Sequence, residues 1–101
     1  MKQRSVVFSA QAESDLIDIY DWISHRAGPE VAMRYLARIE DYCATFAYGS
    51  ERGTKRDDIR PGLRTVGFER RITIAFVVQD IRVIILRIYY GGRNWTEIEL
   101  I

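Results

Sequence analysis

A chain of 101 residues has room for one domain, so we expect residues 1–101 to share a single core. Hydrophobic residues make up 48% of the chain, yet no run approaches the roughly 18 apolar residues that a membrane-spanning helix requires. The formal net charge of +1 lacks the large basic excess of a protein that contacts many phosphates. The N-terminus turns polar after three apolar residues, unlike a secretory signal peptide, and we therefore expect a cytosolic protein.

The first elements predicted are a strand and a helix. The segment "SVVFS", residues 5–9, is typical of a short strand with Val6 and Phe8 on one face. Ser9 stands at a helix N-cap position, because apolar residues recur at helical spacing from Ala10 to Ala27. Acidic residues fall between the apolar ones, and the first of them favour the positive end of the helix dipole. These acids are Glu13, Asp15, Asp18 and Asp21.

A second helix follows directly. Gly28 ends the first helix, and Pro29 suits the first position of the next one. The apolar stripe of this second helix consists of Ala32, Tyr35, Leu36, Ile39, Cys43 and Phe46. Because the connection is so short, we expect the two helices to form an antiparallel hairpin.

The remaining elements are strands. After a charged segment without periodicity, strands are predicted at residues 63–68, 70–78 and 82–90. Gln79 and Asp80 separate the last two, which indicates a tight antiparallel hairpin. The order β-α-α-β-β-β, with helices and strands segregated along the chain, predicts an α+β fold with a three-stranded antiparallel portion of the sheet.

The alternation of side chains assigns two faces to this sheet. The face predicted to lie under the helices carries Ile72, Ile74, Phe76, Val78, Ile84, Leu86 and Ile88. The opposite face carries Thr73, Ala75, Val77, Val83, Ile85, Arg87 and Tyr89. Two helices in one hairpin cover one face, so the second face is expected to be partly open, as at a partner-binding surface. The alternative is that the C-terminal "NWTEIELI" folds back over it, and both remain open.

Cysteine and histidine usage excludes several kinds of site. Cys43 and His25 are the only residues of their types, so an internal disulfide and a thiolate or imidazole metal cluster are excluded. We therefore expect no metal and no cofactor. His25 falls near the end of the first predicted helix, where a cation complements the helix dipole. Cys43 falls on the apolar side of the second helix, which predicts a buried and inert thiol.

Four segments in this order and spacing resemble the ParE toxins of bacterial toxin-antitoxin modules, within the RelE/ParE superfamily. They are "FSAQAESDLIDIYDWI", "RDDIRPGLR", "RRITIAFVV" and "VIILRIYYGGRN". The resemblance runs from Phe8 to Asn94, and its most specific parts are "RDDIRPGLR" and "RIYYGGR". The arrangement known for this family, a helical hairpin packed on an antiparallel sheet, agrees with the elements predicted above.

The resemblance implies a toxin that is not itself an enzyme. ParE toxins inhibit DNA gyrase by stabilising its cleaved-DNA state, and a ParD-type antitoxin neutralises each of them. The implied partners are thus a ParD-like antitoxin, in a hetero-oligomer, and gyrase, without sequence-specific nucleic-acid binding or a membrane. The antitoxin tail would contact the open face and its rim. The residues expected to bind it are Arg60, Arg64, Ala75, Val77, Val83, Ile85 and Arg87.

Two alternatives stay open at this point. RelE-type toxins cut mRNA on the ribosome, which needs a proton donor or acceptor and cations beside the scissile phosphate. Tyr89 or Tyr90 would act on the proton. The candidate cations are Arg60, Arg64, Arg71, Arg87 and Arg93. The other alternative is an interaction module that descends from a toxin and has lost its activity.

The segment "RDDIRPGLR" is interpreted as a structural connector rather than a catalytic loop. Asp57 and Asp58 lie within reach of the arginines and would cancel much of their field, so mutual ion pairs are expected. Pro61 and Gly62 suit the two corners of a type II turn, which would direct Leu63 into the core.

The segment "GGRNW" has two interpretations of equal weight. The glycines let the chain turn at the sheet edge while Trp95 fills the core, or Arg93 and Trp95 anchor the chain on its target. The residues expected to bind the target are Tyr90, Arg93 and Trp95.

Overall fold

The computed structural model describes residues 3–91, and the predictions for Arg93 and Trp95 therefore lie outside the described residues. The elements are β1 (Ser5–Phe8), α1 (Ala10–Ala27), α2 (Pro29–Ala44), the short 3-10 helix η1 (Thr45–Ala47), β2 (Thr54–Lys55), β3 (Leu63–Phe68), β4 (Ile72–Val78) and β5 (Arg82–Tyr90). The predicted α+β order is confirmed. The two-residue strand β2, in the charged segment before β3, and the short helix η1 were not predicted.

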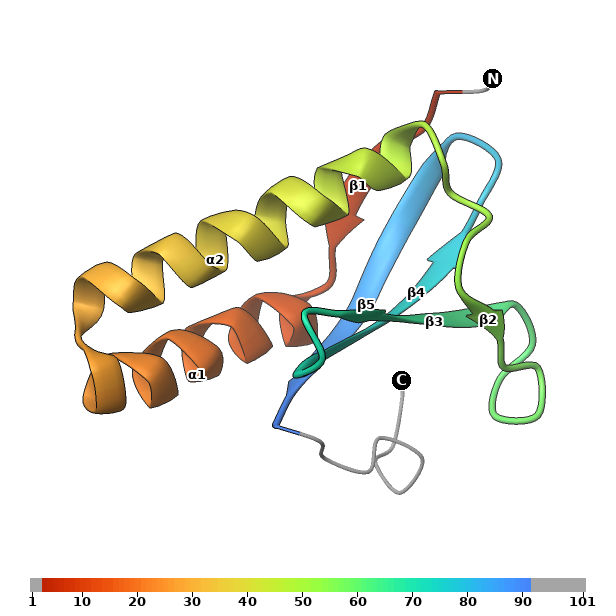
Figure 1. Cartoon of the computed structure of the whole chain (residues 1–101). Helices are drawn as coiled ribbons and strands as arrows, with labels where there is room; N and C mark the ends of the chain where they lie inside the picture. The colour runs from red at the N-terminus through yellow and green to blue at the C-terminus, as the bar shows by residue number, and fades with distance from the viewer. Residues whose placement is uncertain (1–2, 92–101) are drawn as a thin grey trace.

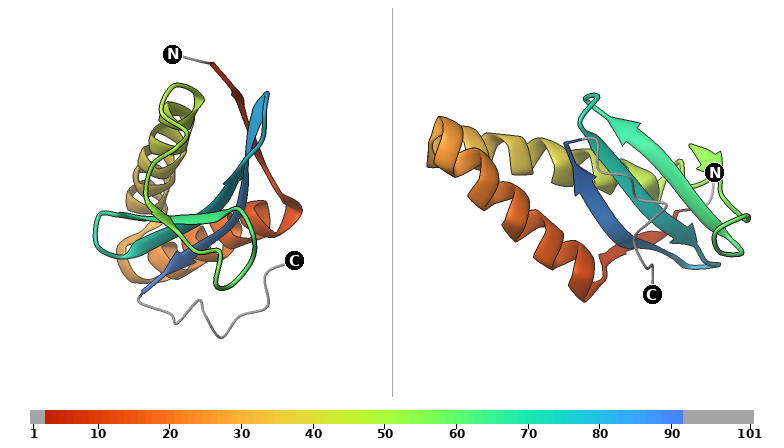
Figure 2. Two further views of the ribbon diagram at one scale, coloured as in Figure 1. Left: turned by 90° about the vertical axis from the view of Figure 1, so that its right-hand side faces the viewer. Right: turned by 90° about the horizontal axis from the view of Figure 1, so that it is seen from below.

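The strands form one mixed sheet of five strands in the order β1-β5-β4-β3-β2. β1 pairs with β5 in parallel, and the other neighbours are antiparallel. The two helices run antiparallel, lie close together at the tip of their hairpin and diverge toward the start of α1 and the end of α2 (Figure 1). Figure 2 shows both helices on one side of the twisted sheet. The predicted helical hairpin on an antiparallel sheet is therefore present, with β1 added as a parallel edge strand.

Local signals explain where the two helices begin and end. The Ser9 hydroxyl accepts a hydrogen bond from the Ala12 N–H (3.0 Å) and donates one to the Leu86 carbonyl (2.8 Å), so the N-cap also fastens α1 to β5. Gly28 ends α1 with φ of 93°, a backbone conformation that favours glycine. Pro29 then begins α2, where its missing N–H is not needed.

The core lies between the helical hairpin and one face of the sheet. Each large apolar side chain buried there contributes roughly 1.5–3 kcal/mol relative to exposure. The buried residues of this core are Ala12, Leu16, Ile19, Ile23, Ala32, Ile39, Cys43, Phe46, Ile72, Ile74, Phe76, Val83, Ile85 and Ile88. Cys43 is fully buried, as predicted.

A β-bulge changes the phase of β5. Ala75 pairs with Arg87 and Phe76 pairs with Ile85, so Leu86 is the extra residue between the two pairs. Side chains alternate between the two faces of a sheet. One extra residue therefore inverts the alternation, so that the residues of β5 before Leu86 point to the opposite face from the one that strict alternation predicts.

The bulge corrects the predicted faces of β5. Val83 and Ile85 were expected on the open face, but both are fully buried in the core beneath the helices. Ile84 and Leu86 were expected in that core, but they are half-buried and lie outside it. The prediction was wrong for these residues, because strict alternation was assumed along the whole strand.

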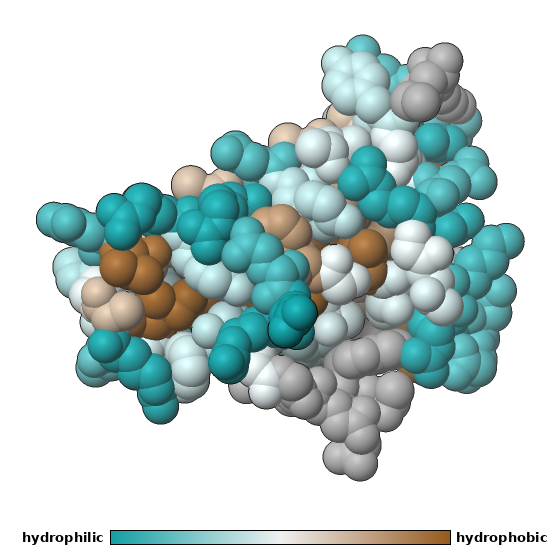
Figure 3. Space-filling model, viewed as in Figure 1, coloured by the Kyte–Doolittle hydropathy of each residue, from teal (hydrophilic) through white to brown (hydrophobic). Residues whose placement is uncertain are grey.

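Not every apolar side chain is covered. Hydrophobic side chains remain visible between the two helices toward the tip of the hairpin (Figure 3). On the helices, Ile17 and Met33 are the most exposed large apolar side chains among the described residues. None of the helices in residues 3–91 is long and apolar enough to cross a membrane.

The connector before β3 is held as predicted. The Arg56 guanidinium donates two hydrogen bonds to Asp58 (3.0 and 2.8 Å), and Asp57 accepts one from the Gly62 N–H (2.8 Å). The Leu63 N–H donates to the Arg60 carbonyl (3.0 Å), and Gly62 has φ of 82°, as a type II turn requires. The turn and the ion pair are confirmed. Leu63 is fully buried, but it lies outside the core that the helices cover.

Candidate functional site

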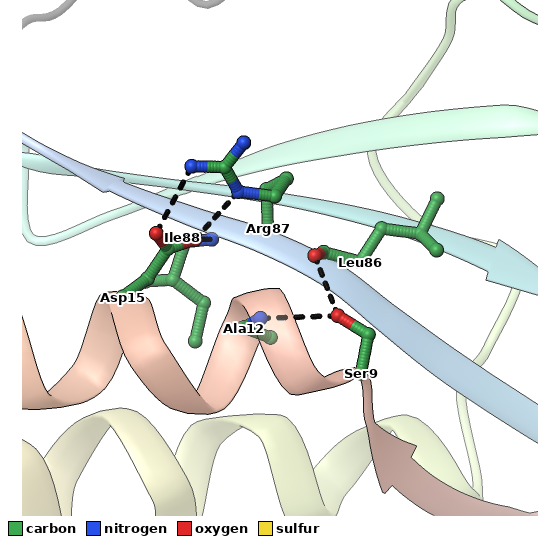
Figure 4. Close-up of polar contacts among 6 residues, drawn as sticks. All are labelled: Ser9, Ala12, Asp15, Leu86, Arg87 and Ile88. Carbon is green, nitrogen blue, oxygen red and sulfur yellow. Dashed lines mark hydrogen bonds and ion pairs between the residues drawn. The ribbon is translucent and has the colours of Figure 1, made fainter. Parts of the chain in front are cut away.

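A buried ion pair joins α1 to β5 at the bulge. Arg87 donates from Nε and Nη2 to the two carboxylate oxygens of Asp15 (2.9 and 3.0 Å), and the Ile88 N–H donates to the same carboxylate (2.8 Å) (Figure 4). Only 17% of the Arg87 side chain and 10% of the Asp15 side chain are exposed. The hydrogen bonds to Asp15 raise the pKa of Arg87 above its already high value. The charge of Arg87 is thus neutralised within the fold, which weakens the prediction that it pairs with a partner.

Sequence reasoning missed the role of Asp15, although a signal was present. Asp15 lies three residues after Ala12 and four before Ile19, both of which are buried. This spacing places it on the same helix face as those residues. An acid on a buried face needs a cation or backbone N–H groups as partners, and β5 supplies both.

Three aromatic side chains meet near the C-terminal end of β5. The ring centroids of Trp22 and Tyr90 are 4.8 Å apart, and those of Tyr35 and Tyr90 are 5.9 Å apart. Trp22 comes from α1, Tyr35 from α2 and Tyr90 from β5. Trp22 is 41% exposed, so this group of rings reaches the surface.

Arginines flank the rings on both sides. The Arg26 guanidinium lies 3.8 Å from the Trp22 ring centroid, and the Arg38 guanidinium lies 4.9 Å from that of Tyr35. We call Trp22, Arg26, Tyr35, Arg38 and Tyr90 the aromatic–arginine cluster. Arginine and tryptophan are enriched among residues that dominate binding energy, so the cluster has the composition of a binding surface.

Tyr35 is poorly suited to proton transfer at neutral pH. Burial and the neighbouring Tyr90 raise the pKa of Tyr35 above its ordinary value. The only histidine, His25, lies exposed on α1, where Nδ1 contacts the Asp21 carbonyl (2.7 Å). Burial raises the pKa of the Cys43 thiol to about 12, so the only cysteine is no nucleophile.

A pocket opens beside the cluster. It has a volume of about 360 Å³ and is lined by Asp15, Asp18, Ile19, Trp22, Ile88, Tyr90 and Gly91. Aromatic and aliphatic walls with two carboxylates suit a side chain of a protein partner better than a phosphate.

The turn between β3 and β4 borders the cluster and has an unusual backbone. Glu69 and Arg70 have φ of 49° and 65°, and they are the only non-glycine residues within 3–91 with left-handed φ. Such a conformation costs on the order of 1 kcal/mol for each residue. Two hydrogen bonds from the Arg38 guanidinium to the Glu69 carboxylate (2.9 and 3.0 Å) hold this turn against α2.

The residues predicted to bind an antitoxin do not form one surface. Val83 and Ile85 are buried beneath the helices, and Ala75 is fully buried as well. Val77 is half-buried. These positions exclude Val83 and Ile85 from direct contact with any partner of the folded chain.

The two arginines predicted at the rim also differ from expectation. Arg64 has a side chain only 14% exposed, which donates to the Arg52 carbonyl (3.2 Å) and lies 3.9 Å from Glu51. Its pocket, about 380 Å³ in volume, also contains Arg4, Lys55, Asp57 and Asp80, so charges of both signs line it. Arg60 lies in the connector, where its carbonyl closes the type II turn.

Of the predicted target-binding residues, the structure describes Tyr90 alone. Tyr90 lies at the centre of the aromatic–arginine cluster, next to rings from both helices. Trp22, Tyr35 and Arg38 were not predicted as site residues. Nothing in their local sequence distinguishes them from ordinary helix residues, because the cluster joins segments that are far apart in the chain.

Comparisons with known proteins agree with the fold. The chain matches the family described as ParE toxin of type II toxin-antitoxin system, parDE, over residues 6–95. A chain of the chromosomal ParDE system from P. aeruginosa is 28% identical with a TM-score of 0.78, covering 89% of this chain and 98% of that one. A chain of the RelBE2 toxin-antitoxin complex from Mycobacterium tuberculosis is 16% identical with a TM-score of 0.65, covering 91% and 95%, and shows a similar fold. No match was found among curated proteins.

Proposed function

Because the chain belongs to the ParE toxin family of type II toxin-antitoxin systems, we propose that it inhibits DNA gyrase by stabilising the cleaved-DNA complex of that enzyme. It acts in the cytoplasm by binding and not by catalysis. The observation that carries this proposal is the aromatic–arginine cluster, in which partly exposed rings and guanidiniums surround Tyr90. The choice of gyrase rests on the family.

The second partner that we propose is a ParD-like antitoxin, in a hetero-oligomer. The similarity to a chain of the P. aeruginosa ParDE system supports this partner. Its tail would lie on the face of the sheet away from the helices, where Val77 and Ile84 are half-buried, and would reach Arg60 at the rim. The tail would not contact Val83 or Ile85, since both are fully buried.

Two of the arginines considered for mRNA cleavage, Arg64 and Arg87, are not free to contact a phosphate. A nuclease would need several cations free to contact one phosphate. Arg87 is paired with Asp15, and Arg64 is mostly buried against the Arg52 carbonyl. These two side chains are therefore poor candidates for stabilising a scissile phosphate.

Growth arrest on induced expression tests the cluster. Trp22→Ala is expected to lower toxicity and Trp22→Phe to retain it, because the partner contacts an aromatic surface. Tyr48→Ala is the matched control, since Tyr48 is 56% exposed and lies outside the cluster. Full toxicity of Trp22→Ala, with expression and melting temperature near those of the wild type, would remove the cluster from the site.

Arg93→Ala extends the test to the segment after β5. We expect this variant to have lower toxicity without a lower melting temperature, since arginine and tryptophan are both enriched among residues that dominate binding energy. Full toxicity would remove Arg93 from the target-binding residues.

A further inference from the structure

Arginines from two distant segments meet beside the aromatic–arginine cluster. Arg38 on α2 donates two hydrogen bonds to Glu69 in the β3–β4 turn, so the helix and the turn are in direct contact. Arg70 and Arg71 follow Glu69 in the chain, and Arg34 lies one helical turn before Arg38 on the same face of α2. A band of strongly hydrophilic side chains crosses this part of the surface from α2 toward the turn (Figure 3). We call Arg34, Arg38, Arg70 and Arg71 the arginine surface.

The arginine surface carries a local excess of positive charge. Four arginines against Glu69 leave an excess of three positive charges, in a chain whose net charge is +1. Arg34, Arg70 and Arg71 are exposed, and none of them forms an ion pair with a carboxylate of residues 3–91. The nearest acids along α2 are Glu30, four residues before Arg34, and Glu40 and Asp41, two and three residues after Arg38. They flank the surface on the helix and leave the turn side basic.

The backbone of the turn has a conformation that is unfavourable for glutamate and arginine. Glu69 and Arg70 occupy left-handed positions, where glycine or asparagine would be more stable. The Glu69 carboxylate holds Arg38, while the Arg71 carbonyl accepts a hydrogen bond from the Gly91 N–H (3.0 Å) and so fixes the turn against the end of β5. The result is a rigid support that presents Arg70 and Arg71 to solvent.

We propose that the arginine surface binds the phosphate backbone of duplex DNA, without reading the bases. Guanidinium groups suit phosphates, because their N–H groups donate two parallel hydrogen bonds to phosphate oxygens. The choice of DNA rests on the proposed function, since a toxin bound to gyrase lies next to the DNA that the enzyme holds. Contact with this DNA would stabilise the ternary complex of toxin, gyrase and cleaved duplex, while the aromatic–arginine cluster contacts the enzyme itself.

Fluorescence anisotropy of a labelled duplex of about 30 base pairs, titrated with the purified chain over a series of salt concentrations, tests the proposal. The variant Arg34→Gln/Arg70→Gln removes two charges of the arginine surface that pair with no carboxylate of residues 3–91. The matched control, Lys55→Gln/Arg82→Gln, removes two exposed charges elsewhere. Each phosphate contact contributes about 0.9 to the slope of log affinity against log salt. We expect the first variant to lose about two from this slope and to bind about tenfold more weakly near 100 mM salt, and the control to match the wild type.

Equal slopes for the two variants, or no measurable binding by the wild type, would overturn the proposal. Tighter binding to single-stranded RNA of the same length would overturn the choice of DNA. If the arginine variant loses affinity for an acidic antitoxin-tail peptide and keeps its DNA affinity, the surface belongs to the antitoxin and the proposal fails.

A gyrase cleavage assay on the same proteins separates this proposal from the proposed function. A wild-type chain that binds DNA through the arginine surface and leaves gyrase unaffected would contradict gyrase inhibition and keep the DNA contact. If the wild-type chain traps cleaved DNA and Arg34→Gln/Arg70→Gln traps it to the same extent, the result would contradict the DNA contact and leave gyrase inhibition in place.

Discussion

Asp15 shows how one buried charge ties the helical hairpin to the sheet. Its carboxylate accepts two hydrogen bonds from Arg87 and one from the Ile88 N–H, so most of its hydrogen-bonding capacity is used. A buried ion pair adds little over a well-packed apolar pair, but removal of one partner leaves an uncompensated charge in the interior. Removal of Asp15 alone is therefore expected to destabilise the fold, because the buried charge of Arg87 would lose its partner.

Asp15→Asn is expected to lower the free energy of unfolding by roughly 2–4 kcal/mol, because Arg87 would keep its charge without a carboxylate. The matched control is Asp18→Asn, on the exposed side of the same helix, with an expected change within about 0.5 kcal/mol. Urea unfolding followed by circular dichroism measures both. Equal stability of the two variants would show that the ion pair is solvated in solution.

The Cys43 thiol is expected to be unreactive in the folded chain. Its side chain is fully buried, and burial raises its pKa to about 12, so almost no thiolate exists at pH 8. A chromogenic disulfide reagent should label the thiol only after the chain is unfolded in denaturant. Complete labelling within minutes under native conditions would contradict the burial of this residue.

The contact between Arg38 and Glu69 gives a pH dependence with a defined sign. The hydrogen bonds from Arg38 lower the pKa of Glu69 below the ordinary 4.5. A carboxylate with a lowered folded-state pKa stabilises the fold above the unfolded pKa, and this stabilisation is lost as the pH falls through the folded-state value. Glu69→Gln should therefore be less stable than the wild type at pH 7.

The difference between Glu69→Gln and the wild type should disappear at a pH well below the ordinary pKa of glutamate, because both side chains are then neutral. Denaturant unfolding at pH 7 and at about pH 2 measures it, with Glu30→Gln as the control on the same helix as Arg38. A difference that is independent of pH would mean that the ion pair does not form.

At the scale of elements, close backbone approach decides how β2 joins the sheet. Gly53 has φ of 74°, and a Cβ at this position would lie 2.2 Å from the Thr65 carbonyl oxygen of β3. Only glycine fits both the conformation and the space. The pairing of Thr54 with Thr65 and of Lys55 with Arg64 depends on this approach.

Gly53→Ala is expected to lower the free energy of unfolding by at least about 2 kcal/mol, because both strain and a backbone clash result. Gly67→Ala provides the contrast, since the nearest atom to its Cβ, the Ile72 carbonyl oxygen, lies 3.9 Å away and no left-handed φ is present. Thermal unfolding of the two variants measures the difference. A neutral Gly53→Ala would show that the segment before β2 adapts.

The sequence predicts the elements well where the hydrophobic pattern is regular. The bounds of α1, β3 and β5 agree with the expected ranges, because caps, turn residues and periodicity coincide there. The bulge in β5 was not predictable, since residues 83–86 are all apolar and their pattern has no phase. β2 has two residues and exists only through its pairing with β3, so it leaves no pattern in the sequence.

The candidate site was predictable only in part. Tyr90 was expected among the target-binding residues, and it lies at the centre of the cluster. Its neighbours Trp22 and Tyr35 come from two helices, and no periodicity within either helix indicates that the rings meet. The Arg38–Glu69 pair joins residues 31 positions apart, which only the packing of α2 against the β3–β4 turn brings together.

At the scale of the whole molecule, two surfaces have different characters. The aromatic–arginine cluster and the arginine surface lie together where both helices meet the end of β5 and the β3–β4 turn. No helix of residues 3–91 covers the other face of the sheet, which is the proposed site of the antitoxin tail. A chain of this kind has room to bind an antitoxin on one side and a target on the other. Neutralisation would then require the antitoxin to exclude gyrase sterically or to extend over the cluster.

The most direct test of the central claim is an assay of the purified chain with purified gyrase and plasmid, beside cell-free translation in which the integrity of the mRNA is followed. Gyrase inhibition predicts lost supercoiling and accumulated linear DNA in the first reaction, with intact mRNA in the second. Cut mRNA together with unaffected supercoiling would contradict it and identify the chain as a ribosome-dependent nuclease.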